Sequence, residues 1–180
     1  MAYIDLREFI PALESHGELQ RVSKEICPEY ELAGGCIQTI AERGPVLLFE
    51  NVKDSRLPVF NNPLGSRRRV ALALQCEEKD LLKVWTERAH KKISPVIVKD
   101  GPCKEVTVGA PDVTRFPLPI LWHEGDGGPY VTFAQFVCKN PETGVRNVGI
   151  HRIQIKGPQH GGLLVMPPHT LQLPPFLKKV

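Results

Sequence analysis

The sequence lacks the features of a membrane or secreted protein. Nowhere in its 180 residues do eighteen apolar residues follow one another, and the amino terminus has no basic segment followed by an apolar run. We therefore expect no membrane span and a cytoplasmic protein. Hydrophobic residues make up 42% of the chain and charged residues 24%, which is typical of a folded domain with a packed core.

Paired cysteines are also missing. The five cysteines stand singly, without any C-x-x-C spacing, at Cys27, Cys36, Cys76, Cys103 and Cys138. This argues against a cysteine zinc site and against a disulfide framework, since both use closely or regularly spaced cysteines. We expect reduced thiols, mostly in buried positions.

A strong charge of one sign is absent as well. The formal net charge is only +3, which is too small to attract a polyanion by itself. The one dense basic cluster is Arg67-Arg68-Arg69, for which we expect a solvated loop. The alternative, a phosphate or nucleic-acid contact, would need aromatic or further basic residues around the triplet, and the sequence shows none. No nucleic-acid partner is expected.

The apolar pattern near the amino terminus predicts a helix. Leu6, Phe9, Ile10 and Leu13 recur at helical spacing, and Asp5 with Glu8 forms a capping-box pattern at the start. Pro11 falls inside this helix, where it removes a hydrogen bond, so a kink or an early break is expected.

The following residues alternate between helix and strand patterns. We predict a second helix, a buried strand and a third helix over residues 30–43, 45–49 and 78–92. Such alternation is typical of a small α/β layer domain, which we place at residues 1–105.

From residue 106 the composition changes, with prolines breaking the chain before a region rich in β-forming residues. Strand patterns at 130–139 and 148–156, separated by a turn cluster at 140–144, predict a β-hairpin. A third strand is predicted at 162–166. Three strands cannot close a barrel, so we expect residues 106–180 to form an incomplete second domain.

Chemistry-bearing side chains concentrate in the second strand of that hairpin. Strand alternation puts Asn147, Gly149 and His151 on one face and Ile150 and Arg152 on the other. A glycine lets a ligand approach the backbone, and an arginine can pair with a carboxylate or phosphate through two hydrogen bonds. An ordinary surface strand remains an alternative explanation of this run.

Three stretches resemble one enzyme family. They are Asp5-Leu6-Arg7-Glu8-Phe9 with Gly17-Glu18-Leu19, then Gly44-Pro45-Val46-Leu47-Leu48-Phe49-Glu50-Asn51-Val52, and finally Arg146-Asn147-Val148-Gly149-Ile150-His151-Arg152-Ile153-Gln154 followed by Met166-Pro167-Pro168-His169. The third stretch is similar to the cofactor-binding segment of UbiD-like decarboxylases. Gly125-Asp126-Gly127-Gly128-Pro129-Tyr130 resembles their hydroxyarylic acid branch. The resemblance extends over essentially the whole chain.

The resemblance implies a mixed α/β (α+β) fold, in which a small amino-terminal α/β domain is followed by the first strands of a split β-barrel of flavin-reductase type. It implies a carboxy-lyase that reversibly and non-oxidatively decarboxylates a small aromatic or unsaturated carboxylic acid. The implied cofactors are prenylated FMN and Mn²⁺, with K⁺ as a further candidate ion. Covalent bonding to the modified flavin would stabilise charge as carbon dioxide leaves.

Site residues are carried over only where this chain matches the family motif. Asn147 and His169 match metal ligands, and oxygen and imidazole donors suit manganese. Arg152 matches the arginine that pairs with the substrate carboxylate and is the catalytic candidate. The cofactor-binding candidates are Gly149, Ile150, His151, Arg152 and Pro168. Pro168 replaces the glutamine that the family usually has there, which removes a hydrogen-bond donor near the flavin.

The family's third metal ligand and its acid–base glutamates lie beyond position 180, so we expect the chain alone to be nearly inactive. His123, Glu124 and Asp126 are interpreted as loop residues without an acid–base role. Three readings stay open. The chain is an enzyme fragment or split-gene product that needs a carboxyl-terminal partner chain; or it is a non-catalytic subunit or remnant; or it is a generic flavin-binding split-barrel protein. A homo-oligomer is also compatible with the sequence, which does not define the substrate.

Overall fold

The computed structural model describes residues 3–91, 93–117, 125–140 and 143–164. Internal contacts divide the chain into two compact units, residues 1–27 with 34–110 and residues 28–33 with 111–180. The predicted domain boundary, which gives domains at residues 1–105 and 106–180, stays a prediction. Helices and small sheets together make a mixed α/β structure, which confirms the broad fold class.

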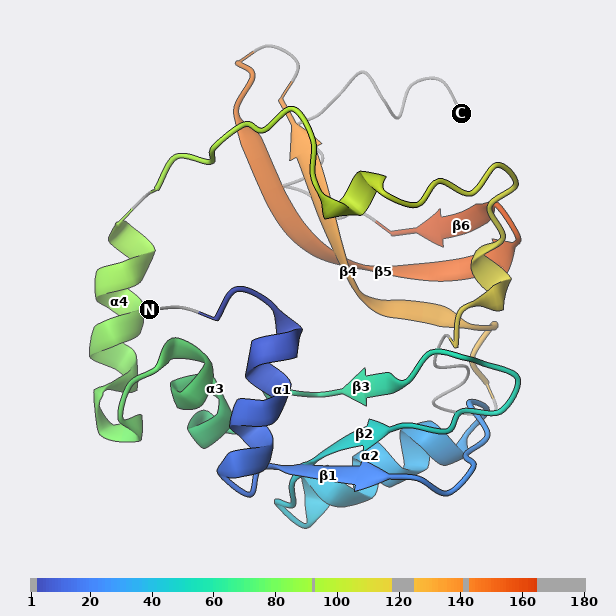
Figure 1. Ribbon diagram of the computed structural model, residues 1–180, viewed down its shortest axis with the longest axis horizontal. Coiled ribbons are helices and arrows are strands. Elements are labelled where there is room, and N and C mark those ends of the chain that lie inside the picture. The colour runs from blue at the N-terminus through green and yellow to red at the C-terminus, as the bar shows by residue number, and fades with distance from the viewer. Residues whose placement is uncertain (1–2, 92, 118–124, 141–142, 165–180) are drawn as a thin grey trace. The chain divides into compact units, whose positions relative to one another are not determined.

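The first unit is built on a three-stranded sheet of β1 (Leu19–Val22), β2 (Val46–Phe49) and β3 (Val59–Asn61), in that order (Figure 1). β1 and β2 run parallel, whereas β3 is antiparallel to β2. A parallel pair needs a long crossover, and α2 (Glu31–Ala41) lies in the connection between β1 and β2. The predicted second helix and buried strand are therefore confirmed.

The central strand β2 is apolar because side chains on both of its faces are covered. All four of its residues are buried. Val46 and Leu48 join a core cluster with Phe9 and Leu13 of α1 (Leu6–Ser15). Partly buried side chains of β3 and of α3 (Arg67–Leu74) pack against this cluster, including Phe60 and Leu72.

The opposite face of β2 lies against α2. A Cβ built on Gly35 of that helix would lie 3.5 Å from Leu47 Cδ1 and 3.6 Å from Phe49 Cζ. Because strand side chains alternate between faces, Leu47 and Phe49 point away from the Val46 and Leu48 side. The first unit thus has helix, sheet and helix layers around β2.

Of the expected kink or early break at Pro11, the early break is wrong. The helix α1 runs unbroken from Leu6 to Ser15 with Pro11 inside. Its start is well capped, because Asp5 Oδ1 accepts a hydrogen bond from the Arg7 N–H at 2.7 Å and Glu8 Oε2 accepts one from the Ile4 N–H at 2.9 Å. Burial of Phe9 and Leu13 holds the helix on the sheet despite the one missing donor.

The expectation of a solvated loop at Arg67-Arg68-Arg69 is also wrong. These residues form the first turn of α3, and Ser66 is its N-cap, with Oγ accepting a hydrogen bond from the Arg69 N–H at 3.2 Å. Arg69 is only 5% exposed. The Ser66 cap and the helix-forming residues after it favour a helix here, despite the dense positive charge.

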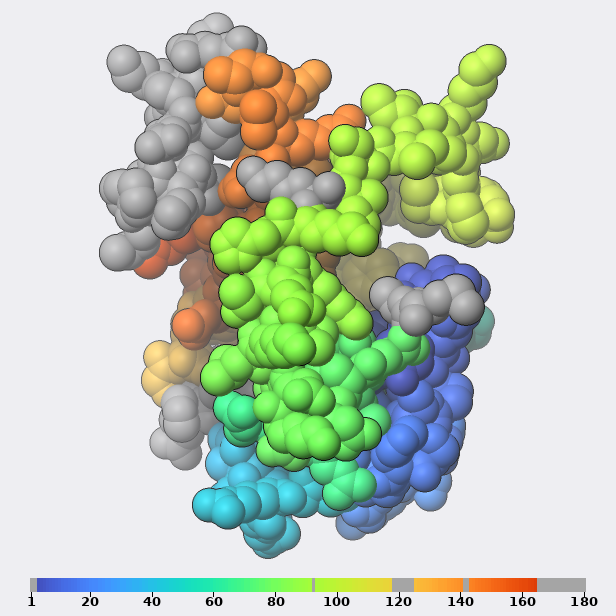
Figure 2. All heavy atoms as spheres, turned by 90° about the vertical axis from the view of Figure 1, so that its left-hand side faces the viewer, coloured from blue at the N-terminus to red at the C-terminus, as the bar shows by residue number. Residues whose placement is uncertain are grey.

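The predicted third helix over residues 78–92 is two elements. A short 3₁₀ turn, η1 (Glu78–Asp80), precedes α4 (Leu81–His90). Figure 2 shows α4 at the surface of the first unit, and its exposed side chains include Leu82 and Trp85. No helix in the described ranges is long and apolar enough to cross a lipid bilayer.

The second unit contains an antiparallel sheet of β4 (Tyr130–Lys139), β5 (Arg146–Gly157) and β6 (His160–Leu163), in that order (Figure 1). The predicted hairpin is confirmed. The third strand begins two residues earlier than predicted, and residues 165 and 166 of the predicted strand lie outside the described chain. A split barrel stays a prediction.

Short 3₁₀ turns precede this sheet along the chain, η2 (Pro102–Lys104) and η3 (Val113–Arg115). The Val113 N–H donates a hydrogen bond to the Pro158 carbonyl at 2.9 Å, which ties η3 to the turn between β5 and β6. The proline-rich segment that follows residue 106 is therefore anchored to the sheet at this point.

Apolar side chains on the sheet of the second unit are largely exposed. From residue 111 to residue 164, Ile155 is the one hydrophobic residue in the described chain that is buried. Large exposed side chains on or next to the three strands are Phe133, Val137, Val145, Val148, Ile150, Leu163 and Leu164. Extended apolar surface of this kind is typical of a binding or association site.

The expectation of buried thiols is wrong for most of the cysteines, because Cys36 is buried whereas Cys103 is exposed and the other three are half-buried. Burial of Cys36 predicts slow thiol chemistry. Its side chain is 3% exposed and its thiol accepts a hydrogen bond from Asn61 Nδ2 at 2.9 Å, while burial raises the pKa of the thiol to about 11. At pH 8 we expect iodoacetamide to modify exposed Cys103 first and Cys36 only after denaturation, because the thiolate is the nucleophile. Peptide mass spectrometry measures this order, and equal rates in the native protein would contradict it.

Candidate functional site

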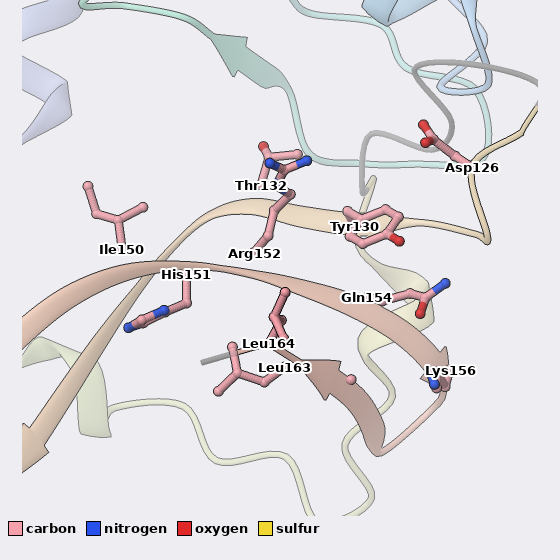
Figure 3. A pocket seen from close by; sticks show the side chains of 11 residues that line it. Asp126, Tyr130, Thr132, Ile150, His151, Arg152, Gln154, Lys156, Leu163 and Leu164 are labelled. Carbon is pink, nitrogen blue, oxygen red and sulfur yellow. The ribbon is translucent and has the colours of Figure 1, made fainter. Parts of the chain in front are cut away.

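A hollow of about 1090 Å³ lies on the sheet of the second unit. Its lining comes from β4, β5, β6 and the loop before β4, as Figure 3 shows. The lining residues are Asp126, Tyr130, Thr132, Ile150, His151, Arg152, Gln154, Lys156, Gly162, Leu163 and Leu164. Arg152, the catalytic candidate from the sequence, is therefore on the wall of a ligand-sized space.

The strand register explains why these side chains meet. Gln154 of β5 pairs with Tyr130 on one side and with Gly162 on the other, so the three residues form a row across the sheet. Arg152 and Lys156 lie two positions to either side of Gln154 on the same face of β5. Two cations flanking an amide and a phenol suit an anionic, partly aromatic ligand.

Asn147, Gly149 and His151 lie on the other face of β5, although His151 also borders the hollow. The alternation of burial supports this: Gly149 and His151 are half-buried, whereas Val148, Ile150 and Arg152 are exposed. The His151 ring meets the Phe136 ring edge-on, with centroids 5.6 Å apart. A Cβ on Gly149 would lie 2.8 Å from His151 Nε2. Gly149 therefore leaves room for this imidazole, a role that the sequence interpretation did not foresee.

The predicted metal ligands are only partly covered by the structure. Asn147 lies near the start of β5, opposite Cys138 of β4, and on the face away from Arg152. His169, with Pro168, lies outside the described residues. Within the described part of the chain, no three His, Cys, Asp or Glu side chains gather where they could hold a metal ion.

The edge of β5 offers a way for one ligand to reach both faces. β4 pairs with β5 from Arg146 to Gln154, but β6 pairs with it only from Ile153 onward. Residues 146–152 consequently have no partner strand opposite β4 among the described residues. A ligand along this edge would find backbone hydrogen-bonding groups, with Asn147 on one side of it and Arg152 on the other.

The sequence analysis did not identify many of the residues that line the hollow. Lys156 and Gln154 share the face of Arg152 and could have been found by extending the strand alternation. Tyr130 and Gly162 come from other strands, and only the pairing register identifies them. Asp126, interpreted as an ordinary loop residue, lines the hollow as well.

Gln154 also fixes the loop before β4. Its Nε2 donates a hydrogen bond to the Gly127 carbonyl at 2.7 Å, and a Cβ on Gly127 would lie 2.6 Å from that nitrogen. The next residue, Gly128, has a φ of +134°, which favours glycine. The Gly-Gly sequence thus allows the loop to approach β5 closely beside the hollow.

Comparisons with known proteins decide the family. Residues 10–89 match the family model of the 3-octaprenyl-4-hydroxybenzoate carboxy-lyase N-terminal domain, and residues 95–174 match that of the Rift-related domain of the same enzyme. The chain belongs to the UbiD family. It corresponds to the amino-terminal portion of that family, as the sequence predicted.

Individual relatives agree with this assignment. An uncharacterized protein of Archaeoglobus fulgidus is 37% identical over 175 residues, which cover 86% of this chain and 36% of that protein. An evolved dimeric form of the UbiD-class enzyme HmfF from Pelotomaculum thermopropionicum, solved with prFMN, is 34% identical with a TM-score of 0.87, covering 95% of this chain and 40% of that one.

A vanillic acid decarboxylase of Sedimentibacter hydroxybenzoicus, solved in a closed form, is 31% identical with a TM-score of 0.84. That match covers 92% of this chain and 38% of the other. The UbiD-family chain described here therefore spans about 40% or less of the length of each of these relatives.

The Gln154 hydrogen bond gives a test of the loop's anchoring. In a Gln154→Leu variant, which keeps a similar volume, the Gly127 carbonyl loses its donor, so we expect faster amide hydrogen exchange in residues 125–128. A Gln135→Leu variant, at an exposed position of β4, is the matched control. Unchanged exchange in the first variant would show that the hydrogen bond does not hold the loop.

Proposed function

We propose that this chain builds the flavin-binding part of a non-oxidative UbiD-type decarboxylase that acts on an aromatic or unsaturated carboxylic acid. One observation carries the proposal: Arg152, Gln154 and Lys156 face a hollow of about 1090 Å³ from one strand of a UbiD-family sheet. The relative HmfF was solved in complex with prFMN, which makes prenylated FMN the proposed cofactor.

The residues present fit this cofactor. An isoalloxazine needs an open, partly apolar space, and Ile150, Leu163 and Tyr130 line the hollow beside its polar groups. Backbone groups of residues 150–152 lie along the β5 edge that no described strand covers. We assign cofactor contacts to Gly149, Ile150, His151, Arg152 and Pro168. When bound, the modified flavin supplies an electron sink for the substrate carbon.

A metal ion would hold the phosphate of this cofactor. Asn147 offers an amide oxygen, and we propose His169 as the imidazole ligand, a donor pair that suits Mn²⁺. The cation would offset the phosphate charge, and K⁺ is a second candidate. The family's glutamate ligand would complete this set.

Arg152 has the substrate-binding role in this proposal. Its guanidinium projects from the exposed face of β5 and can hold a carboxylate through two parallel hydrogen bonds. Holding that group fixes the bond to be broken relative to the cofactor, and the same positive charge favours the ionised form of a neighbouring carboxylic acid. Lys156, two positions from Gln154 on the same face, adds to the anion-attracting field.

Full activity would require more polypeptide than this chain. The family's acid–base glutamates are proposed to come from a carboxyl-terminal partner chain, and the exposed apolar side chains of the β4–β6 sheet offer surface for such an association. The chain alone is then expected to release no carbon dioxide from aromatic acids. A non-catalytic subunit is the second candidate, because the same apolar surface would serve association without chemistry.

Cofactor binding tests the proposal directly. Titration of the purified chain with prenylated FMN, followed by flavin fluorescence, should show binding that needs Mn²⁺. Asn147→Ala and His169→Ala should each weaken it by about tenfold or more, because each removes a proposed metal ligand.

His160→Ala is the matched control, since His160 is an exposed histidine on β6 outside the proposed ligand set. Circular dichroism confirms that each variant is folded. Absence of flavin binding by the folded wild-type chain, or equal loss in the His160→Ala variant, would refute the assignment of the metal ligands.

A further inference from the structure

A second hollow, of about 400 Å³, lies in the first unit where α3 begins. Its lining combines Gly65, Ser66 and the three arginines that follow with Ile40, Arg43 and Glu78. It shares no residue with the β5 hollow, and the proposed decarboxylase function does not use it. The structure thus brings Arg43 to the Arg67-Arg68-Arg69 triplet, which supplies the further basic residue that the sequence did not show nearby.

The three arginines occupy an electrostatically unfavourable position. They form the first turn of α3, which contains no acidic residue. The amino-terminal end of a helix carries partial positive charge, so cations there are destabilising and anions are stabilising. Ser66 Oγ satisfies the Arg69 N–H, but the N–H groups of the helix residues before it have no acceptor within the helix. An anion at this end would offset the positive charge and would accept hydrogen bonds from the free N–H groups.

Carboxylates in the protein neutralise only part of this charge. Glu18 pairs with Arg68 at 3.1 Å and with Arg69 at 3.3 Å, and Glu78 lies 3.8 Å from Arg67. Four guanidinium groups therefore meet two carboxylates, which leaves two positive charges at the hollow. Arg43 is exposed and has no carboxylate partner within the described chain.

A buried and incompletely bonded guanidinium is the second indication of a ligand. Arg69 is 5% exposed, and its Nη1 donates to the Gly44 carbonyl at 3.0 Å and to Glu18 Oε2. Its Nε is buried without a hydrogen-bond partner among the described residues. Such an unsatisfied donor is costly and often marks the place of an ion or water.

We propose that this hollow is an oxyanion site that takes the phosphate group of a small molecule. Arg43 and Arg67 reach it from the end of α2 and the start of α3, and guanidinium forks match the geometry of phosphate oxygens. The helix amino terminus adds N–H donors and favourable partial charge. Arg69, held by Glu18 and Gly44, also lines the hollow, and its Nε is the donor that a bound oxyanion would satisfy.

A phosphate titration at fixed ionic strength tests the site. The ¹⁵N-labelled chain is titrated with inorganic phosphate, and in a second arm with glycerol 3-phosphate, without manganese or flavin so that the β5 site does not contribute. Amide shifts of Ser66, Arg67, Arg68 and Arg69 are expected to saturate. Tighter binding of the ester would identify an esterified phosphate as the ligand, whereas similar or tighter binding of the free ion would identify inorganic phosphate.

Two exposed arginines serve for the variants, so that the core is left intact. Arg67→Gln and Arg43→Asn should each raise the phosphate dissociation constant by about tenfold or more. Asparagine is chosen at position 43 because the residue has a φ of +54°, which asparagine tolerates. Arg56→Gln, an exposed arginine outside the hollow, is the control for lost charge.

Unsaturable shifts in both arms, or shifts away from residues 66–69, would overturn the proposal. So would an equal loss of binding in Arg56→Gln, since this would show attraction by net charge alone. Folding of every variant is checked by the dispersion of the same amide spectrum.

Discussion

The pairing of β5 with β4 decides which side chains can act together in the second unit. His151 pairs with Ala134 and Ile150 with Gln135, and after an irregularity between Val131 and Ala134 the register resumes with Tyr130 opposite Gln154. A slip by one residue would exchange the two faces of β5. Arg152, Gln154 and Lys156 would then exchange faces with their neighbours along the strand and no longer meet Tyr130 and Gly162 in one row. The proposed division between substrate side and metal side depends on this register.

The two faces of β5 suit different parts of one ligand. The face of Arg152 carries cations and a phenol beside an open hollow, whereas the face of Asn147 carries an amide, a glycine and a histidine packed against Phe136. The strand edge that no described strand covers between residues 146 and 152 joins them. In the proposed function, the phosphate of the cofactor lies on the side of Asn147 and its ring system on the side of Arg152.

The two units bury their apolar residues to different extents. In the first, β2 is buried on both faces, and α1 and α2 cover it, so hydrophobic burial stabilises that unit by itself. In the second, most large apolar side chains on the sheet remain exposed. This exposure is expected if the sheet serves mainly for binding and association. It also agrees with the finding that the chain spans only part of the length of its relatives.

Local patterns predicted the β4–β5 hairpin and the faces of Asn147 and Arg152, because strand alternation and turn residues act over a few positions. Pro11 was misjudged because packing of Phe9 and Leu13 offsets a local penalty. Ser66 is a recognisable cap, yet charge density at Arg67-Arg68-Arg69 favoured a loop. The remaining features could not be predicted from local patterns, because they follow from contacts between distant segments. They are the approach of Arg43 to α3 and the rows of residues across β4, β5 and β6.

Amide hydrogen exchange along β5 tests the central claim most directly. The chain is compared with and without prenylated FMN and Mn²⁺, and exchange is followed at the amides of residues 146–152 that do not bond to β4. If the flavin lies along this edge, exchange at residues 150–152 slows when the cofactor binds, while the strands of the first unit are unaffected. Bound flavin that leaves β5 exchange unchanged, or protects only other segments, would contradict the account.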